Sequence, residues 1–216
     1  MSEMIHRFAA AFGALPPYGI GGALLILLYS IQAELRFGAK ARSSAPGATD
    51  RGSTWAVSLA SMVPVMGFVF TMQARMPALK AGFPAWLRES GAMPGLPAIA
   101  WVGVGLGVLG LCLRLWAVLT LRERYTRTLL VHQEHAIERG GPYRFVRHPG
   151  YLGSLLCLNG IGLASGNAVI FVASIVATLA AYAHRIRAEE AMLVAAFGAP
   201  YERYRREVGA LLPFLR

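Results

Sequence analysis

Long uncharged runs of apolar residues dominate this chain, and polar residues collect in the segments between them. A run of about 18 or more apolar residues predicts a membrane-crossing helix, because about 20 helical residues cross a hydrocarbon core of roughly 30 Å. The fourth run is shorter than the others, and a tight turn at 165–167 joins it to the fifth, which predicts a helical hairpin. The expected fold is all-α, an integral membrane protein with about five transmembrane helices over 18–35, 54–73, 98–121, 149–164 and 168–184.

The connecting segments show neither a second domain nor an internal repeat. The segment 36–53 is rich in helix breakers, and 75–97 is a Pro-rich stretch predicted to lie at the outer interface. A long Arg-rich connector precedes the fourth run, and after residue 184 the chain becomes charged and amphipathic. We expect C-terminal helices at the inner membrane surface, broken at Gly198 and Pro200.

The chain is predicted to be a single structural domain with two functional parts. Residues 1–110 would form the N-terminal transmembrane helices, and residues 111–216 would form a catalytic membrane core.

Composition supports the membrane interpretation. The chain is 56% hydrophobic and only 15% charged, whereas soluble domains carry about 25% charged residues. The net charge of +10 therefore does not indicate a nucleic-acid surface, and no nucleic-acid partner is expected. Sixteen of the 21 Lys and Arg residues lie after the first and third runs and in the tail, which favours a cytoplasmic tail and an outside N-terminus. Abundant Arg, Ala and Gly indicate a bacterial source, so we expect the bacterial inner membrane.

Cysteine and histidine positions give no indication of a metal site. Cys112 and Cys157 both lie inside apolar runs and lack metal-ligand spacing, so neither a disulfide framework nor a metal centre is predicted. His132 and His135 in the Arg-rich connector would need further ligands nearby to bind a metal.

One connector carries chemistry-bearing residues directly before the fourth apolar run. Residues 141–151 read Gly-Pro-Tyr-Arg-Phe-Val-Arg-His-Pro-Gly-Tyr. Pro149 suits the first position of a helix, and the N–H groups of that first turn would stabilise a carboxylate or phosphate, with Arg147 adding positive charge. The alternative is that His148 only caps the helix while the Arg residues meet lipid phosphates.

Three charged residues stand within or at the edge of apolar runs. Arg114 lies inside the third run, so it must snorkel, pair or line a polar cavity, and Glu189 would be a suitable partner. Arg185 and Glu189 are four residues apart and share a helix face at the headgroup boundary. A modest surface ion pair is the alternative to a functional role there.

These motifs resemble those of the isoprenylcysteine carboxyl methyltransferase family, integral-membrane enzymes related to the phospholipid methyltransferases. The resemblance covers residues 135–216 closely and 111–134 more loosely, while the first hundred residues match only as generic spans. A Gln that the family often has shortly before the connector His is His132 here. The matching elements are 141–144, 147–153, Arg185-Ile186, Glu189-Glu190, Phe197-Gly198, Tyr201, Tyr204, Val208 and Pro213-Phe214.

The resemblance implies a cytoplasmic S-adenosylmethionine pocket, formed by the connector and the C-terminal helices. It implies that Arg114 and Arg185 hold or orient the methyl acceptor, and that Glu189 acts with them. The implied cofactor contacts are His135, Ala136, Ile137, Glu138, Tyr143, His148, Pro149, Gly150, Tyr151 and Glu189.

The chemistry of methyl transfer agrees with these residue types. Glu189 suits a cationic part of the cofactor, and Tyr143 or Tyr151 could stack on the adenine or face the sulfonium. A carboxylate acceptor is already ionised at neutral pH and needs no base, whereas an amine or thiol would need one, with Glu189 or His148 as candidates. We expect an isoprenylcysteine-type carboxylate, reached from the inner leaflet among membrane lipids. The alternatives are a phospholipid amine or small thiol, an NADPH-dependent sterol-reductase-like enzyme, and a non-catalytic membrane partner protein.

Overall fold

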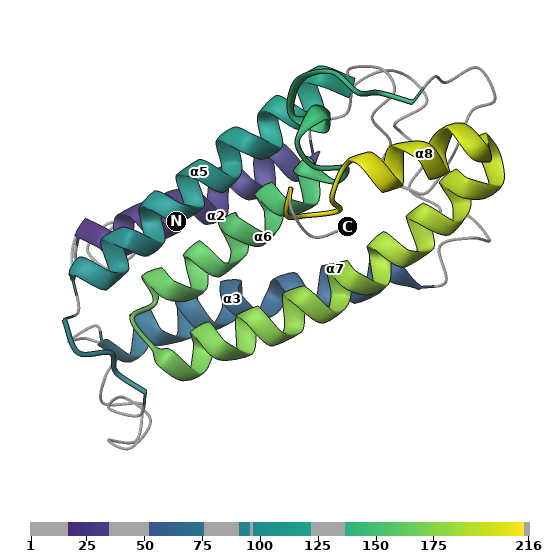
Figure 1. Ribbon diagram of the computed structural model, residues 1–216. Coiled ribbons are helices and arrows are strands. Elements are labelled where there is room, and N and C mark those ends of the chain that lie inside the picture. Colours follow the sequence, from purple (N-terminus) through teal and green to yellow (C-terminus); the bar gives the residue numbers. More distant parts are fainter. Residues whose placement is uncertain (1–16, 35–51, 76–90, 96, 122–136, 214–216) are drawn as a thin grey trace.

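The computed structural model describes residues 17–34, 52–75, 91–95, 97–121 and 137–213. Within these ranges the regular elements are helices, and β-structure is limited to two isolated bridges. This confirms the predicted all-α class. The elements, labelled in Figure 1, are α2 (Pro17–Glu34), α3 (Ser53–Arg75), α5 (Ala98–Leu121), the 3₁₀ helix η4 (Gly141–Arg144), α6 (Pro149–Ala164), α7 (Ala168–Phe197) and α8 (Ala199–Glu207).

Three of the described helices, α3, α5 and α7, are long and apolar enough to cross a membrane. The apolar part of α2 is shorter, Tyr18–Gln32, and α6 has 16 residues. The membrane character of the chain is thereby supported, while the count of five spans stays a prediction. The helix that begins at residue 168 continues without a break to Phe197. Its 30 residues extend about 45 Å, so one end of α7 projects beyond a hydrocarbon core of roughly 30 Å.

The predicted hairpin between α6 and α7 is confirmed. Gly166 takes a positive φ of 63° in the turn, and the side chain of Asn167 accepts hydrogen bonds from the first free N–H groups of α7. Arg75, at the end of α3, donates to the carbonyls of Ser165 at 2.7 Å and Gly166 at 3.2 Å. The hairpin turn is therefore fixed to α3 as well as to its own two helices.

Helices α5 and α6 touch through their backbones, and this is the most extensive helix pairing among the described residues. A Cβ atom added at Gly110 would lie 2.4 Å from the amide nitrogen of Cys157 and 2.5 Å from the carbonyl oxygen of Gly153. A Cβ at Gly103 would lie 2.7 Å from the carbonyl oxygen of Gly160. Small residues allow this close approach, as they do in many membrane helix pairs. The predicted division at residue 110 falls inside α5 and stays a prediction.

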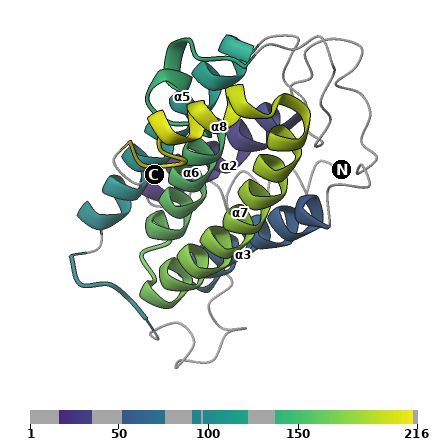
Figure 2. The same cartoon turned by 45° about the vertical axis from the view of Figure 1, so that its right-hand side comes forward.

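Beyond this pairing, α3 packs along α7 on the other side of the bundle. At the far end of α7, Gly198 adopts a positive φ of 58° and the chain reverses into α8. Figure 2 shows α8 turning back across the bundle end toward η4 and the start of α6. Sequence segments that are distant along the chain thus meet at one end of the bundle.

Candidate active site

The loop between η4 and α6 is held in place by the segment that follows α8. Val146 and Gly209 form a parallel bridge. The backbone N–H of Arg147 donates to the carbonyl of Gly209 at 2.8 Å, and that of His148 donates to Ala210 at 3.0 Å. These backbone bonds give the loop a fixed conformation, so the side chains of Arg147 and His148 have defined directions.

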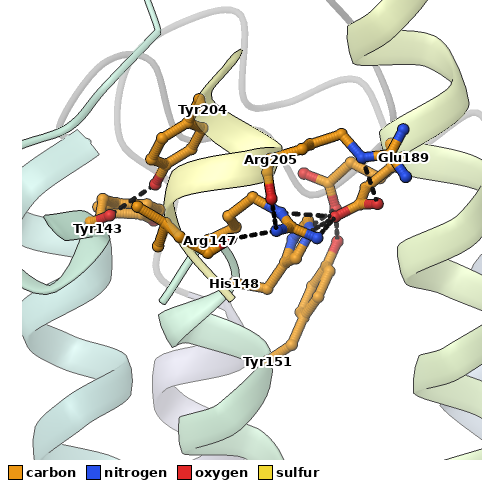
Figure 3. Close-up of polar contacts among 9 residues, drawn as sticks. Tyr143, Arg147, His148, Tyr151, Glu189, Tyr204 and Arg205 are labelled. Carbon is orange, nitrogen blue, oxygen red and sulfur yellow. Dashed lines mark hydrogen bonds and ion pairs between the residues drawn. The ribbon is translucent and has the colours of Figure 1, made fainter. Parts of the chain in front are cut away.

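Tyr204 of α8 adds a side-chain bond to the same assembly. Its hydroxyl donates to the carbonyl of Tyr143 at 2.6 Å (Figure 3). Burial raises the pKa of the Tyr204 phenol to about 12, so the hydroxyl stays protonated and keeps its donor role at physiological pH. Arg139 lies over the Tyr204 ring at 4.9 Å and pairs with Glu207 at 2.8 Å.

Arg147 and Glu190 form a buried ion pair at the centre of the cluster. The Arg147 Nε and Nη2 atoms lie 2.8 and 2.7 Å from Glu190 Oε1, and both residues are 8% exposed. The Arg147 Nη1 atom also donates to the carbonyls of Arg205 and Val208. Arg205 Nε approaches the other Glu190 oxygen at 3.2 Å. Because its charge is paired and its donors are bonded, Arg147 joins α7 to the C-terminal segment.

His148 precedes α6 in the capping position, but its side chain makes no capping hydrogen bond. Its Nε2 atom lies 3.2 Å from Glu190 Oε1, and its Nδ1 atom lies 3.8 Å from Glu189 Oε2. The imidazole ring stacks on Tyr151 with centroids 5.5 Å apart and an interplanar angle of 6°. The structure therefore turns His148 toward the two carboxylates of α7 instead of toward the helix N–H groups.

Tyr151 joins the two charged residues of α7 that the sequence places four apart. Its hydroxyl donates to Glu189 Oε2 at 2.5 Å and accepts from Arg185 Nε at 3.1 Å. The Nη1 atom of Arg185 donates to the hydroxyls of Ser53 at 3.0 Å and Thr54 at 2.8 Å. The structure thus brings His148, Tyr151, Arg185 and Glu189 together, while their roles stay a prediction.

Arg114 lies within the bundle at the α5–α6 contact and is 9% exposed. Its Nη1 atom donates to Ser154 Oγ at 2.7 Å, and its guanidinium lies 5.5 Å from the ring centroid of Tyr29. The Tyr29 hydroxyl in turn lies 3.5 Å from that of Tyr182, whose ring is tilted against Tyr151 at 5.4 Å. A chain of polar aromatic contacts therefore runs from Arg114 to Tyr151.

The remaining predicted cofactor residues are placed as follows. His135 and Ala136, like His132, lie outside the described residues. Half-buried Glu138 accepts the N–H of Gly140 at 2.8 Å. The Tyr143 hydroxyl lies 3.5 Å from the carbonyl of Ala117, on α5. Ile137 is half-buried and Pro149 is buried. At Gly150, an added Cβ would meet nothing closer than Ala117 Cβ at 3.9 Å.

Several residues of this cluster were not predicted as site residues. Glu190 and Arg147 belong to the motifs recognised in the sequence, but the sequence does not show that they pair with each other. The side chain of Tyr201 in α8 is 3% exposed, and its hydroxyl has no hydrogen-bond partner within the described ranges. Burial and the charge of nearby Glu190 raise the pKa of Tyr201, so this hydroxyl stays protonated and can donate a hydrogen bond. Residues 137–213 and the other described segments contain no group of three potential metal ligands.

Comparisons with known proteins all identify isoprenylcysteine methyltransferases as similar to this chain. The model of the isoprenylcysteine carboxyl methyltransferase (ICMT) family matches residues 103–195. A probable protein-S-isoprenylcysteine O-methyltransferase of Oryza sativa subsp. indica is 33% identical over 54% of this chain and 62% of its own length. Protein-S-isoprenylcysteine O-methyltransferase A of Arabidopsis thaliana is 32% identical over 60% of this chain and 68% of its own. This chain thus spans less than two thirds of the rice relative.

A solved structure has the same fold. It is that of the eukaryotic intramembrane Ras methyltransferase ICMT, with a TM-score of 0.57 and 24% sequence identity. The match covers 73% of this chain and 52% of that one. At this identity the likeness shows the fold alone. The relatives named here are eukaryotic, so they do not support the bacterial source, which stays a prediction.

Proposed function

Because this chain belongs to the isoprenylcysteine carboxyl methyltransferase family, we propose that it transfers a methyl group from S-adenosylmethionine to a lipophilic carboxylate. The main support for this proposal is that the family's motifs assemble around the carboxylate of Glu189 at one end of the bundle. An isoprenylcysteine is the acceptor named for the relatives, and it is the acceptor proposed here.

The residues present fit the proposed cofactor. Glu189 is one quarter exposed, so its carboxylate can meet a cationic amino or sulfonium group. Buried Tyr201 offers a hydroxyl with no partner among the described residues, and it can donate to the cofactor's carboxylate. At the start of α6, Gly150 carries a backbone N–H, and a Cβ added there would meet nothing closer than Ala117 Cβ at 3.9 Å, so a carboxylate can approach this N–H. When bound, the cofactor supplies an activated methyl group on its sulfonium.

The protein's own contribution would be alignment and charge. Arg185 and Arg114 are buried guanidinium groups at the bundle interior, and such groups orient a carboxylate through paired hydrogen bonds. An ionised carboxylate needs no proton removed, so His148 need not act as a base. Two buried cations favour an anionic acceptor over the amine of a phospholipid, because a like charge there is unfavourable.

The orientation in the membrane is part of the proposal. The polar end of α7, with η4 and α8, would face the cytoplasm, where the sequence also concentrates Arg residues. The acceptor would enter from the inner leaflet of a bacterial inner membrane. Accessibility labelling of single cysteines at both bundle ends would test this orientation, and labelling of the α8 end from outside would contradict it.

The proposed activity is tested by offering the detergent-purified protein labelled S-adenosylmethionine and a panel of prenylated cysteine carboxylates, phospholipid amines and thiols. We expect label in the carboxylate alone. Glu189→Gln should weaken binding of the cofactor about 10- to 100-fold, since a charge-assisted contact is worth about 1.5–3 kcal/mol. Glu202→Gln, an exposed change on α8, is the control and should leave binding unchanged. Stabilisation by NADPH without any methyl transfer would reject the proposal in favour of a reductase.

Tyr201→Phe separates ligand binding from stability. Removing a buried hydroxyl that has no partner among the described residues should leave the melting temperature unchanged or raised, because an unsatisfied polar group costs about 1–3 kcal/mol. Cofactor affinity should nevertheless fall about 5- to 10-fold, the worth of about one hydrogen bond. Calorimetric titration with S-adenosylmethionine, alongside a thermal melt of the same sample, measures both. Unchanged affinity would remove Tyr201 from the cofactor site.

A further inference from the structure

Arg185 and Glu189 present a difficulty for the proposed chemistry. They lie four residues apart on α7, so they share a face where opposite charges ordinarily pair. A direct ion pair would place the cation that is proposed to orient the acceptor against the carboxylate that is proposed to meet the cofactor. Both charges would then be neutralised by each other.

The structure shows a different arrangement. The hydroxyl of Tyr151, which comes from α6, lies between the two side chains, 3.1 Å from Arg185 Nε and 2.5 Å from Glu189 Oε2. Within the described part of the chain, the ion-pair contact of Glu189 is with His148 Nδ1 at 3.8 Å. The phenol is well suited to this place, because one oxygen can accept from a guanidinium while its proton is donated to a carboxylate.

Arg185 is also held from its far side. Ser53 and Thr54, at the start of α3, accept hydrogen bonds from Arg185 Nη1 at 3.0 and 2.8 Å. The ring of Tyr151 cannot swing away easily, because it stacks on His148 and is tilted against Tyr182. Arg185 is thereby directed toward α3, and Glu189 is directed toward the loop that precedes α6.

We propose that Tyr151 is a positioning residue whose hydroxyl keeps Arg185 and Glu189 apart, so that one serves the acceptor and the other serves the cofactor. This inference rests on the proposed function. It differs from the expectation that the Tyr151 ring contacts the adenine or sulfonium, because it assigns the role to the hydroxyl. Loss of the hydroxyl would let Arg185 collapse onto Glu189.

A double-mutant cycle tests this proposal, and the measured quantity is the affinity for S-adenosylmethionine. Tyr151→Phe in the wild-type background should weaken binding about 10-fold, because Glu189 then pairs with Arg185. The same change in an Arg185→Gln background should weaken binding less than about 2-fold, because no cation remains to compete. Tyr18→Phe removes the phenol of a buried tyrosine in α2 and should have no effect in either background.

The outcomes are distinguishable. Equal losses from Tyr151→Phe in the two backgrounds would overturn the positioning role while leaving the proposed methyl transfer intact. No cofactor binding by the wild-type protein would instead reject the proposed function.

Arg185→Gln alone gives a second measurement that does not require the Tyr151 variant to fold. It should raise the KM for the carboxylate acceptor at least 10-fold and leave the Kd for the cofactor within about 3-fold. Equal loss of both affinities would contradict the separation of the two charges.

Discussion

Glu190→Gln is expected to lower the free energy of unfolding by about 3–5 kcal/mol, because removing one partner of a buried ion pair leaves the other charge uncompensated. Arg147 would keep its positive charge at 8% exposure, facing a neutral amide instead of a carboxylate at 2.7–2.8 Å. His148 and Arg205, which approach Oε1 and Oε2 of the same carboxylate, would lose its negative charge as well. Denaturant titration in detergent, followed by circular dichroism, measures the change.

Glu207→Gln is the matched control. Glu207 pairs with Arg139 at 2.8 Å, but both side chains are nearly half exposed, so this pair is worth at most about 1 kcal/mol. The two variants make the same chemical change in neighbouring parts of the structure. Equal effects, or a loss below about 1 kcal/mol in Glu190→Gln, would show that the buried pair does not hold the loop to α7.

Gly110→Ala should lower stability by about 3 kcal/mol, the upper end of the cost of overpacking, although it adds a single methyl group. The new carbon would lie 2.4 Å from a backbone nitrogen and 2.5 Å from a backbone oxygen of α6. Backbone atoms cannot rotate away, so α5 and α6 would have to separate along the contact that also positions Arg114. Cofactor binding and thermal stability should fall together.

Gly105→Ala tests the same helix without the contact. A Cβ at Gly105 would meet nothing within 4 Å, so the change should be neutral or stabilise α5 by about 0.5–1 kcal/mol. A melting temperature of Gly110→Ala equal to that of Gly105→Ala would mean that the two helices are not in backbone contact.

The ends of the helices were largely predictable from the sequence. The runs 98–121 and 149–164 coincide with α5 and α6, because an apolar segment in a bilayer can satisfy its backbone only as a helix. Which helices pack against each other was harder to predict from the sequence. Gly103 and Gly110 are visible in the sequence, but glycine alone does not specify which neighbouring helix approaches it.

The candidate site was predictable as a set of residues and less so as a network. Glu189 and Glu190 are adjacent, so on a helix they point about 100° apart. His148 contacts both carboxylates, but their other partners differ. Their sequence does not say that Tyr151 bonds one and Arg147 the other. The backbone hydrogen bond from Arg147 to Gly209 could not be predicted from the sequence for a further reason. Such bonds use groups that nearly every residue carries, so they leave no pattern of side chains.

The pairing of the loop before α6 with the segment after α8 also sets an order for biogenesis. Arg147 and its acceptor Val208 are 61 residues apart, so a ribosome that has delivered α6 has yet to translate that acceptor. The helices can therefore enter the lipid before the loop reaches its final conformation. Nascent chains stalled between α7 and α8 should be inserted yet inactive, because Arg147 would still lack its acceptors Arg205 and Val208.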